Sequence, residues 1–170
     1  ALSTDKAVSP ANLYGATKLC SEKLILAANN IRGKNKIKFS IVRYGNVMGS
    51  RGSVLPIFIR KNLRNFPITD ISMTRFNITL KQGVDLVDLV MQRNSGGEIF
   101  VHKLKSFYIR DLAKAIDSKK KIKIIGIRKG EKIHEELINF EESKYCVETK
   151  NLFILYPNPE EYERGSLKVI

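Results

Sequence analysis

The sequence has no tryptophan and contains only two cysteines and two histidines among its 170 residues. Cys20 and Cys146 lie far apart without the spacing of metal ligands, which favours two reduced thiols in a cytoplasmic protein over a disulfide framework. No run of 18 apolar residues is present, so no membrane-spanning helix is predicted. His134 lies close to Glu131 and Glu135, but carboxylates beside a single histidine are common in helices, and no metal is expected.

A glycine-rich turn of the form G-x-G-x-x-G is also absent. Gly45, Gly49 and Gly52 follow a predicted strand, but their spacing is wrong and no acidic residue follows about twenty positions later. These glycines are instead expected to let the backbone pass close to a ligand. The sequence lacks an initiator methionine as well, and its first residues resemble the end of a strand. We therefore expect the chain to be the C-terminal part of a longer one.

Acidic residues are scarce relative to basic ones, and the net charge is +13. Residues 1–130 carry 25 basic and 8 acidic side chains, a net +17, whereas residues 131–170 carry 5 and 9, a net −4. Such an excess attracts a nucleotide diphosphate or nucleic acid, although a lysine-rich composition produces it without any partner. The run Lys119–Lys123 lacks interleaved aromatic residues and is interpreted as a solvated loop before a strand.

Helical patterns occur in four segments. Apolar spacing predicts a helix over residues 11–30, with Pro10 before it and Gly33 after it. Thr79 and Gln82 form a capping box at the start of another helix. One face of that helix consists of Val84, Val87 and Met91. Two shorter helices are predicted over residues 54–65 and 109–116.

Runs of strand length and composition alternate with these helices. They cover residues 37–44, 97–102, 122–127 and 152–156. Helices that alternate with buried strands predict an α/β fold with a largely parallel sheet. The last forty residues resemble a smaller, more acidic appendage.

The segment Tyr14-Gly-Ala-Thr-Lys18 places a phenol and an ammonium four residues apart. On a helix the two side chains share a face, one turn apart. The ammonium favours the phenolate form, which can take a proton from a sugar hydroxyl. Tyr and Lys pairs at this spacing are also common on helix surfaces, so the motif alone does not identify a catalytic site.

A second polar group, Thr4, Asp5 and Lys6, precedes Tyr14 at the end of the first apparent strand. In an open α/β sheet the carboxyl ends of the strands face the ligand crevice. We therefore expect these three side chains to point toward the same cavity as Tyr14. A solvated turn with an incidental ion pair is the alternative interpretation.

The segments Ala1–Ala7 and Asn12–Leu19 together resemble the active-site region of extended short-chain dehydrogenases/reductases. More narrowly, they are similar to the 5-inverting UDP-N-acetylglucosamine 4,6-dehydratases of bacterial polysaccharide and flagellin-sugar biosynthesis. Lys6 carries this narrower likeness, because related hexose dehydratases usually have Glu there. The resemblance implies a Rossmann-like parallel sheet, with residues 1–65 completing an NAD(P)-binding domain. Residues 66–170 would form a smaller α/β substrate-binding region interleaved with the last Rossmann elements.

Later segments extend the resemblance to about residue 155. Arg43–Ser53 is similar to the loop that passes the nicotinamide and the sugar nucleotide, and Ile71–Phe76 to a substrate-side segment. Ile125–Glu135 is similar to the segment that holds the nucleotide diphosphate and ribose. Its Arg128 suits a phosphate group, because arginine forms bidentate, charge-assisted hydrogen bonds with phosphate. The implied site residues are catalytic Thr4, Asp5, Lys6, Tyr14 and Lys18; cofactor-binding Tyr14, Lys18, Tyr44 and Asn46; and substrate-binding Asn46, Arg51, Ser53, Arg75, Arg128 and Glu131.

The reaction that the resemblance implies uses tightly held NADP, with NAD as the alternative. Tyr14, assisted by Lys18 and Thr4, would take the proton of the C4 hydroxyl as the C4 hydride leaves. Lys6 would act as the base at C5 and Asp5 as the acid that protonates the departing C6 hydroxyl. The hydride would then return to C6, and protonation of C5 from the opposite face would invert it. The sequence alone does not divide the roles of Asp5 and Lys6.

Two other functions remain open at this point. One is a related NAD(P)-dependent sugar-nucleotide epimerase or reductase, and the other is a non-catalytic module that binds anions or nucleic acid. For the dehydratase we expect a UDP-sugar substrate, no nucleic-acid or membrane partner, and a homo-oligomer in the full-length form. The chain by itself is expected to be inactive, because the phosphate-binding glycine turn is missing from it.

Overall fold

The computed structural model describes residues 1–60, 62–160 and 162–163. The chain folds into two compact units, each built from segments that are separated along the sequence. Unit 1 contains Ala1–Tyr44, Lys81–Lys103 and the segment from Glu136 onward, and unit 2 contains Gly45–Leu80 and Leu104–Glu135. The boundary expected between residues 65 and 66 falls inside unit 2.

Unit 1 is built on a five-stranded mixed sheet with the order β1-β2-β6-β10-β9. The strands β1 (Leu2–Thr4), β2 (Ile41–Tyr44) and β6 (Ile99–His102) run parallel. By contrast, β10 (Leu152–Leu155) is antiparallel both to β6 and to β9 (Cys146–Glu148). The α/β class with parallel strands is confirmed, but the parallel part of this sheet ends at β6.

The last part of the chain is integral to this sheet rather than an appendage. Leu152 and Leu155 on β10 are buried, and β10 lies between β6 and β9. The prediction of a separate acidic appendage is therefore wrong. Of the acidic residues described in this part of the chain, Glu148 lies on β9 and the others lie outside the two strands, while β10 is apolar enough to lie inside a sheet.

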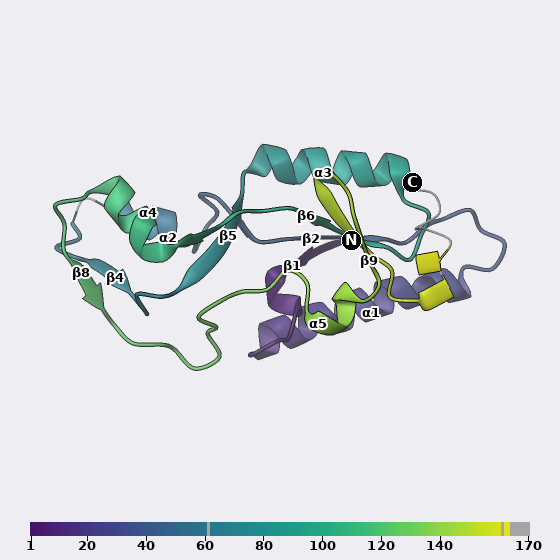
Figure 1. Ribbon diagram of the computed structural model, residues 1–170, viewed down its shortest axis with the longest axis horizontal. Helices are drawn as coiled ribbons and strands as arrows, with labels where there is room; N and C mark the ends of the chain where they lie inside the picture. The colour runs from purple at the N-terminus through teal and green to yellow at the C-terminus, as the bar shows by residue number, and fades with distance from the viewer. Residues whose placement is uncertain (61, 161, 164–170) are drawn as a thin grey trace. The chain divides into compact units, whose positions relative to one another are not determined.

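Helix α3 (Leu80–Arg93) covers one face of the sheet of unit 1, whereas α1 (Leu13–Ile31) and α5 (Phe140–Ser143) lie on the other (Figure 1). The face of α3 that packs on the sheet contains Leu86 and Val90, not Val84 and Met91, which are 51% and 73% exposed. Both sets of residues have helical spacing and apolar side chains. The sequence pattern therefore predicted the helix but not which side of it would be buried.

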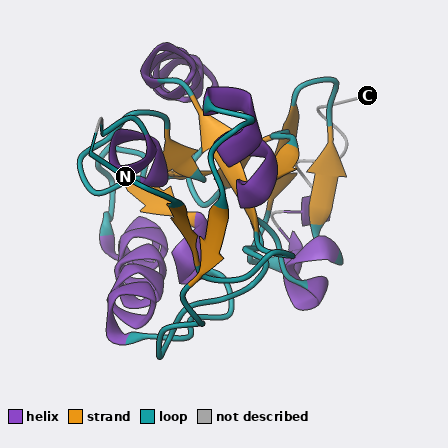
Figure 2. Cartoon of the chain, turned by 90° about the vertical axis from the view of Figure 1, so that its left-hand side faces the viewer, coloured by secondary structure: helices purple, strands orange, loops and turns teal. Residues whose placement is uncertain are grey.

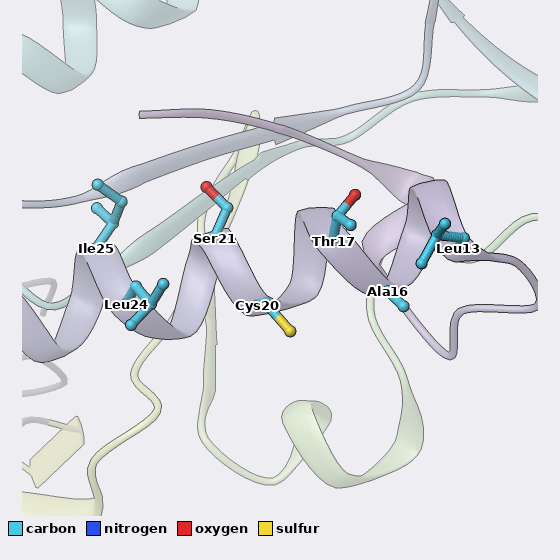
Figure 3. A pocket seen from close by; sticks show the side chains of 7 residues that line it. All are labelled: Leu13, Ala16, Thr17, Cys20, Ser21, Leu24 and Ile25. Carbon is cyan, nitrogen blue, oxygen red and sulfur yellow. The ribbon is translucent and has the colours of Figure 1, made fainter.

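Helix α1 packs on the sheet through an unusual set of residues. Its only two buried residues are Gly15 and Glu22, whereas Leu13 and Leu24 are 79% and 72% exposed. Cys20 is exposed too. A shallow hollow on this outer side is shown in Figure 3, and its lining consists of Leu13, Ala16, Thr17, Cys20, Ser21, Leu24 and Ile25.

Unit 2 is made of short strands and helices joined by loops (Figure 2). One sheet has the order β3-β5-β7 and a second pairs β4 with β8. The strands are β3 (Asn46–Val47), β4 (Phe66–Ile68), β5 (Thr74–Ile78), β7 (Ser106–Tyr108) and β8 (Ile122–Ile124). The helices are α2 (Val54–Phe58) and α4 (Ile109–Ile116), and the core contains Phe58, Phe66, Ile68, Met73, Ile109 and Ala113.

Two predicted elements of unit 2 are shorter in the structure. Helix α2 ends at Phe58 instead of Asn65, because the residues that follow offer little apolar surface to bury; Lys61 lies outside the described residues. Strand β8 ends at Ile124 instead of residue 127. Gly126 has a φ of +85°, a left-handed conformation that ends an extended run.

Candidate active site

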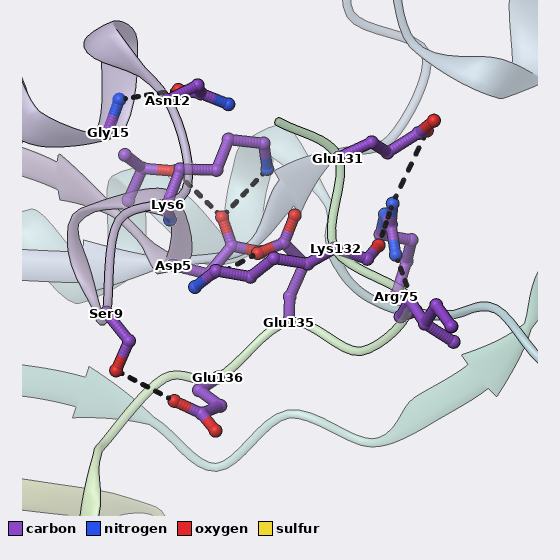
Figure 4. Close-up of polar contacts among 12 residues, drawn as sticks. Asp5, Lys6, Ser9, Asn12, Gly15, Arg75, Glu131, Lys132, Glu135 and Glu136 are labelled. Carbon is purple, nitrogen blue, oxygen red and sulfur yellow. Dashed lines mark hydrogen bonds and ion pairs between the residues drawn. The ribbon is translucent and has the colours of Figure 1, made fainter. Parts of the chain in front are cut away.

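The end of β1 leads directly into a 3₁₀ turn, η1 (Asp5–Ala7), that holds the first polar group. Thr4 Oγ1 donates a hydrogen bond of 2.8 Å to Asp5 Oδ1, and Lys6 Nζ lies 2.9 Å from the same oxygen (Figure 4). Asp5 is completely buried, and its other oxygen, Oδ2, has no hydrogen-bond partner among the described residues. Because buried carboxylate oxygens are normally paired, the unpartnered Oδ2 makes Asp5 a candidate functional group.

The turn of α1 that carries Tyr14 packs against η1 through a glycine. Asn12 caps the helix by accepting a hydrogen bond from the N–H of Gly15, at 2.9 Å. A β-carbon at Gly15 would lie only 2.3 Å from the carbonyl oxygen of Lys6, so only glycine allows this backbone contact. Tyr14, which is 54% exposed, therefore stands on the helical turn next to the Thr4–Lys6 segment, with Lys18 one turn further along.

The contact at Gly15 gives a direct test. We expect Gly15→Ala to push α1 away from η1 and to lower the free energy of unfolding by about 1–3 kcal/mol, the usual range for overpacking. Gly83→Ala on α3 is the matched control, since its new methyl group would meet nothing within 4 Å. The control should be neutral or gain about 0.5–1 kcal/mol from helix propensity. Urea unfolding of both variants checks this, and equal effects would contradict it.

Strand β2 places Tyr44 beside this group. In the parallel pairing of β1 with β2, Thr4 is the register partner of Tyr44, and Ser3 is the partner of Arg43. The carboxyl ends of both strands therefore reach the same edge of the sheet. Thr4, Asp5, Lys6 and Tyr44 lie at this edge, as the sequence predicted for the first three, and α1 brings Tyr14 next to η1.

Three other predicted site residues come shortly after Tyr44 in the sequence and belong to unit 2. Asn46 lies on β3, in register with Asn77 of β5, and Gly45 before it permits close approach, because a β-carbon there would lie 2.8 Å from the carbonyl oxygen of Phe76. Arg51 is exposed in the turn that follows β3. Ser53 is the N-cap residue of α2, and its hydroxyl oxygen is buried without a hydrogen-bond partner among the described residues.

The remaining substrate-side residues form one network in unit 2. Arg75 is buried and donates from Nη1 to the carbonyl of Ile133 at 3.0 Å and from Nη2 to that of Lys132 at 3.0 Å. Glu131 Oε1 lies 3.7 Å from Arg75 Nη2 (Figure 4). Glu131 Oε2 accepts a hydrogen bond of 3.3 Å from the N–H of Arg128. In this structure Arg75 holds the backbone of the 131–133 segment, while the side chain of Arg128 is exposed.

Sequence reasoning missed a buried charge cluster in unit 1. Arg43 is completely buried and contacts Glu22 of α1, at 2.6 Å and 3.0 Å, and Glu142 of α5, at 2.9 Å and 3.0 Å. It also donates to the carbonyl of Leu137 at 3.0 Å. Glu22 follows Lys18 at the same four-residue spacing that links Tyr14 to Lys18. That spacing was the one signal in the sequence that could have indicated that Glu22 lies near the candidate site.

The opposite charges of this cluster shift the pKa values of Arg43 and Glu142. Burial lowers the pKa of Arg43, but hydrogen bonds and charge from Glu22 and Glu142 outweigh it, so the pKa is raised. Burial raises the pKa of Glu142, but hydrogen bonds and charge from Arg43 more than reverse this and the pKa is lowered. Arg43 and Glu142 are therefore both charged at neutral pH.

The described residues include no cluster of three His, Cys, Asp or Glu side chains with metal-binding geometry. His134 is engaged by a 2.8 Å hydrogen bond between its Nδ1 and the hydroxyl of Thr74. Across the same described residues, no helix is both long enough and apolar enough to cross a bilayer.

Two relatives by sequence carry related names. The UDP-N-acetylglucosamine 4,6-dehydratase (inverting) of Campylobacter jejuni subsp. jejuni serotype O:2 is 51% identical over 161 residues, which cover 93% of this chain and 48% of that protein. A UDP-glucose 4-epimerase of Rickettsia bellii is 44% identical over 158 residues, which cover 89% of this chain and 46% of that protein. The chain thus spans about half the length of these relatives.

Two solved structures have the same fold. Pen from Bacillus thuringiensis is 40% identical with a TM-score of 0.85, covering 91% of this chain and 51% of that one. The dTDP-glucose 4,6-dehydratase DesIV of Streptomyces venezuelae, solved with NAD, has a TM-score of 0.69 over 84% of this chain and 52% of its own; at 19% identity this likeness shows the fold alone.

The family itself follows from a broader match. The model of a family described as polysaccharide biosynthesis protein matches residues 1–157. This match covers the Thr4–Lys6 and Tyr14–Lys18 segments and all the strands described above. The resemblance predicted from the sequence is confirmed, and the chain belongs to this polysaccharide biosynthesis protein family of extended short-chain dehydrogenases/reductases.

Proposed function

We propose that the full-length protein is an inverting UDP-N-acetylglucosamine 4,6-dehydratase, and that this chain supplies its catalytic residues. The 51% identity to the Campylobacter enzyme supports the substrate and the reaction. The observation that carries the chemistry is the unpartnered, buried Oδ2 of Asp5, whose other oxygen is held by Thr4 and Lys6. An acid with one oxygen held in place and the other without a hydrogen-bond partner is suited to protonate a departing hydroxyl.

We assign unit 1 to the C-terminal half of a Rossmann domain and unit 2 to the substrate-binding region. Tyr14 and Lys18 offer a hydroxyl and an ammonium next to η1, and these donors suit the ribose of a dinucleotide. We assign NADP as the cofactor, with NAD as the alternative; when bound, it accepts a hydride from C4 and returns one to C6. We also assign Tyr44 of unit 1 and Asn46 of unit 2 to cofactor binding.

The first step is deprotonation of the C4 hydroxyl. Tyr14 takes this proton as phenolate, with the ammonium of Lys18 one helical turn away, and Thr4 orients the hydroxyl by hydrogen bonding. Oxidation at C4 makes the neighbouring C5 hydrogen acidic. Elimination then needs a base at C5 and an acid at the C6 hydroxyl.

The Asp5–Lys6 pair supplies both groups. Transfer of one proton across the 2.9 Å contact from Nζ to the carboxylate makes Lys6 a neutral base and Asp5 a neutral acid. Lys6 then takes the C5 proton, Asp5 gives its proton to the leaving C6 hydroxyl, and the original charges are restored. A proton derived from solvent then reaches C5 on the opposite face, after the hydride has reached C6, and gives the inverted product.

The experiment that tests this function uses the full-length protein with UDP-N-acetylglucosamine in heavy water. We expect a 4-keto-6-deoxy product that carries solvent deuterium at C5, because C5 is deprotonated and reprotonated. Mass spectrometry and NMR of the product locate the label. Interconversion of C4 epimers without deuterium at C5 would instead favour the epimerase, which the 44% identity to the Rickettsia proteins keeps as the second candidate.

Arg128, with Arg51 and Ser53 assisting, is our candidate for binding the diphosphate, and Glu131 for the ribose. Loss of a hydrogen bond to a charged group costs about 1.5–3 kcal/mol, so Arg128→Ala should weaken UDP binding roughly tenfold or more. Arg110→Ala is the control, because Arg110 stacks on the ring of Tyr108. Calorimetric titration with UDP measures both, and an unchanged affinity for Arg128→Ala would refute the assignment.

We also propose that the full-length protein is a cytoplasmic homo-oligomer that uses the outer face of α1. Leu13 and Leu24 are largely exposed there, and contiguous apolar surface commonly marks an interface. Leu24→Lys should reduce the oligomer in sedimentation experiments at micromolar concentration, whereas Lys23→Glu, one residue away, should not. An oligomer that survives Leu24→Lys unchanged would exclude this face.

A further inference from the structure

Helix α1 has little apolar attachment to the body of unit 1. Its two buried residues are Gly15, near its start, and Glu22, two turns beyond Tyr14. A helix that exposes large leucines and buries a glycine and a glutamate is not oriented mainly by hydrophobic packing. The rotation of α1 about its own axis is therefore set largely by the close contact at Gly15, the ion pair of Glu22 and, near the end of the helix, the two hydrogen bonds between Asn29 and the backbone of Phe39.

The Glu22 contact is made to a fully occupied guanidinium. Arg43 has five N–H groups, and it makes five hydrogen bonds: two to Glu22, two to Glu142 and one to the carbonyl of Leu137. A planar fork with every donor used permits one arrangement of its partners, because any rotation breaks a buried, charge-assisted bond. Arg43 is thus a rigid attachment point.

The strand that carries Arg43 links this point to the catalytic edge. Arg43 is the register partner of Ser3, and the next pair in the same ladder is Tyr44 with Thr4. The cluster therefore ties α1, the helix of Tyr14 and Lys18, to the strands that lead into Thr4, Asp5 and Lys6. None of the three charged side chains belongs to the proposed chemistry.

We propose that the Glu22–Arg43–Glu142 cluster is a positioning device, which fixes the rotation of α1 and thereby the distance from Tyr14 and Lys18 to the C4 hydroxyl. This inference rests on the proposed function only in requiring oxidation at C4. Dehydratase and epimerase share that step. The positioning role can therefore fail while the dehydratase assignment stands, and the dehydratase assignment can fail while the positioning role stands. The cluster acts through Tyr14 and contacts no substrate.

The test is Glu22→Gln in the full-length protein, which keeps the shape of the side chain but places an amide N–H₂ against the Arg43 donors. We expect single-turnover oxidation at C4 to slow by at least about tenfold, since small displacements of a catalytic group have such effects. KM for the UDP-sugar should stay within about twofold, because the proposed diphosphate residues lie on other segments. Glu141→Gln on α5, exposed and paired with Lys144, is the matched control.

A kinetic isotope effect separates positioning from simple loss of folded protein. With substrate deuterated at C4, misplacement of Tyr14 makes hydride transfer more rate-limiting and raises the isotope effect on kcat, whereas a smaller folded fraction leaves it unchanged. Glu142→Gln, at the partly exposed edge of the cluster, gives the same readout if Glu22→Gln does not fold. A wild-type isotope effect and wild-type rate per folded site in the variant that folds would overturn the proposal.

Discussion

Replacement of Asp5 by Asn should abolish product formation almost completely while leaving the first half of the reaction intact. Asn keeps the shape of the side chain and its contact with Thr4 but cannot donate an acidic proton to the C6 hydroxyl. Loss of a general acid or base costs about 10²–10⁴-fold in rate. We therefore expect Asp5→Asn to oxidise C4, visible as cofactor reduction in a single turnover, and to release almost no 4-keto-6-deoxy sugar.

The partner variant removes the base instead of the acid. Lys6→Met leaves Asp5 without its 2.9 Å contact and leaves no amine to take the C5 proton. It should lose product to a similar extent and should also lose exchange of C5 with solvent deuterium. Ser9→Ala, just beyond η1, is the control, since Ser9 only donates an exposed 3.2 Å hydrogen bond to Glu136. Wild-type turnover in both Asp5→Asn and Lys6→Met would exclude elimination by this pair.

The second large effect concerns stability. Arg43→Met removes the only cation between Glu22 and Glu142 in the described cluster and leaves two carboxylates without it. Breaking a buried ion pair by deleting one partner costs about 3–5 kcal/mol, so we expect a loss of that size at pH 7. Arg93→Met, in the exposed last turn of α3, should cost less than about 1 kcal/mol.

The pH dependence of that loss has a definite sign. In the wild type the pKa of Glu142 is lowered, so its stabilising contribution is present above the unfolded pKa and disappears as pH falls through the folded pKa. Without Arg43 the same carboxylate is relieved by protonation. The difference between Arg43→Met and wild type should therefore shrink from pH 7 toward about pH 4 in urea unfolding. A difference that grows on acidification would contradict this account.

Local patterns in the sequence were sufficient to predict the helices and strands whose own apolar residues recur at a regular spacing. The short helix over residues 109–116 was predicted with the bounds it has in the structure, because its apolar residues recur every three or four positions. Strand β1 and the position of Thr4 at its end also followed from the sequence. By contrast, β3, β5 and β7 were missed; β3 has only two residues, and their pairing with distant segments creates them.

The same distinction between local spacing and long-range contacts holds for the residues of the candidate site. Tyr14 and Lys18 were predicted as a pair because four residues separate them on one helix, and both lie on α1. Glu22 and Glu142 were not, since Arg43 brings them together from positions 21 and 99 residues away. Arg75 was found as a polar residue in the right segment, but a residue type does not reveal that its donors are used by backbone carbonyls.

The strand order of unit 1 has a consequence for how the protein is made. Val42 pairs with Leu2 on one side and Phe100 on the other, and Phe100 pairs with Ile154. Nearly every neighbouring strand in the sheet is therefore distant along the chain. Such topologies fold slowly, because the entropy cost of closing long loops comes before the stabilisation that strand pairing gives. Because β10 follows β6 by about fifty residues, the edge of β6 stays unpaired during synthesis until β10 has been made, and unpaired strand edges favour association with other chains.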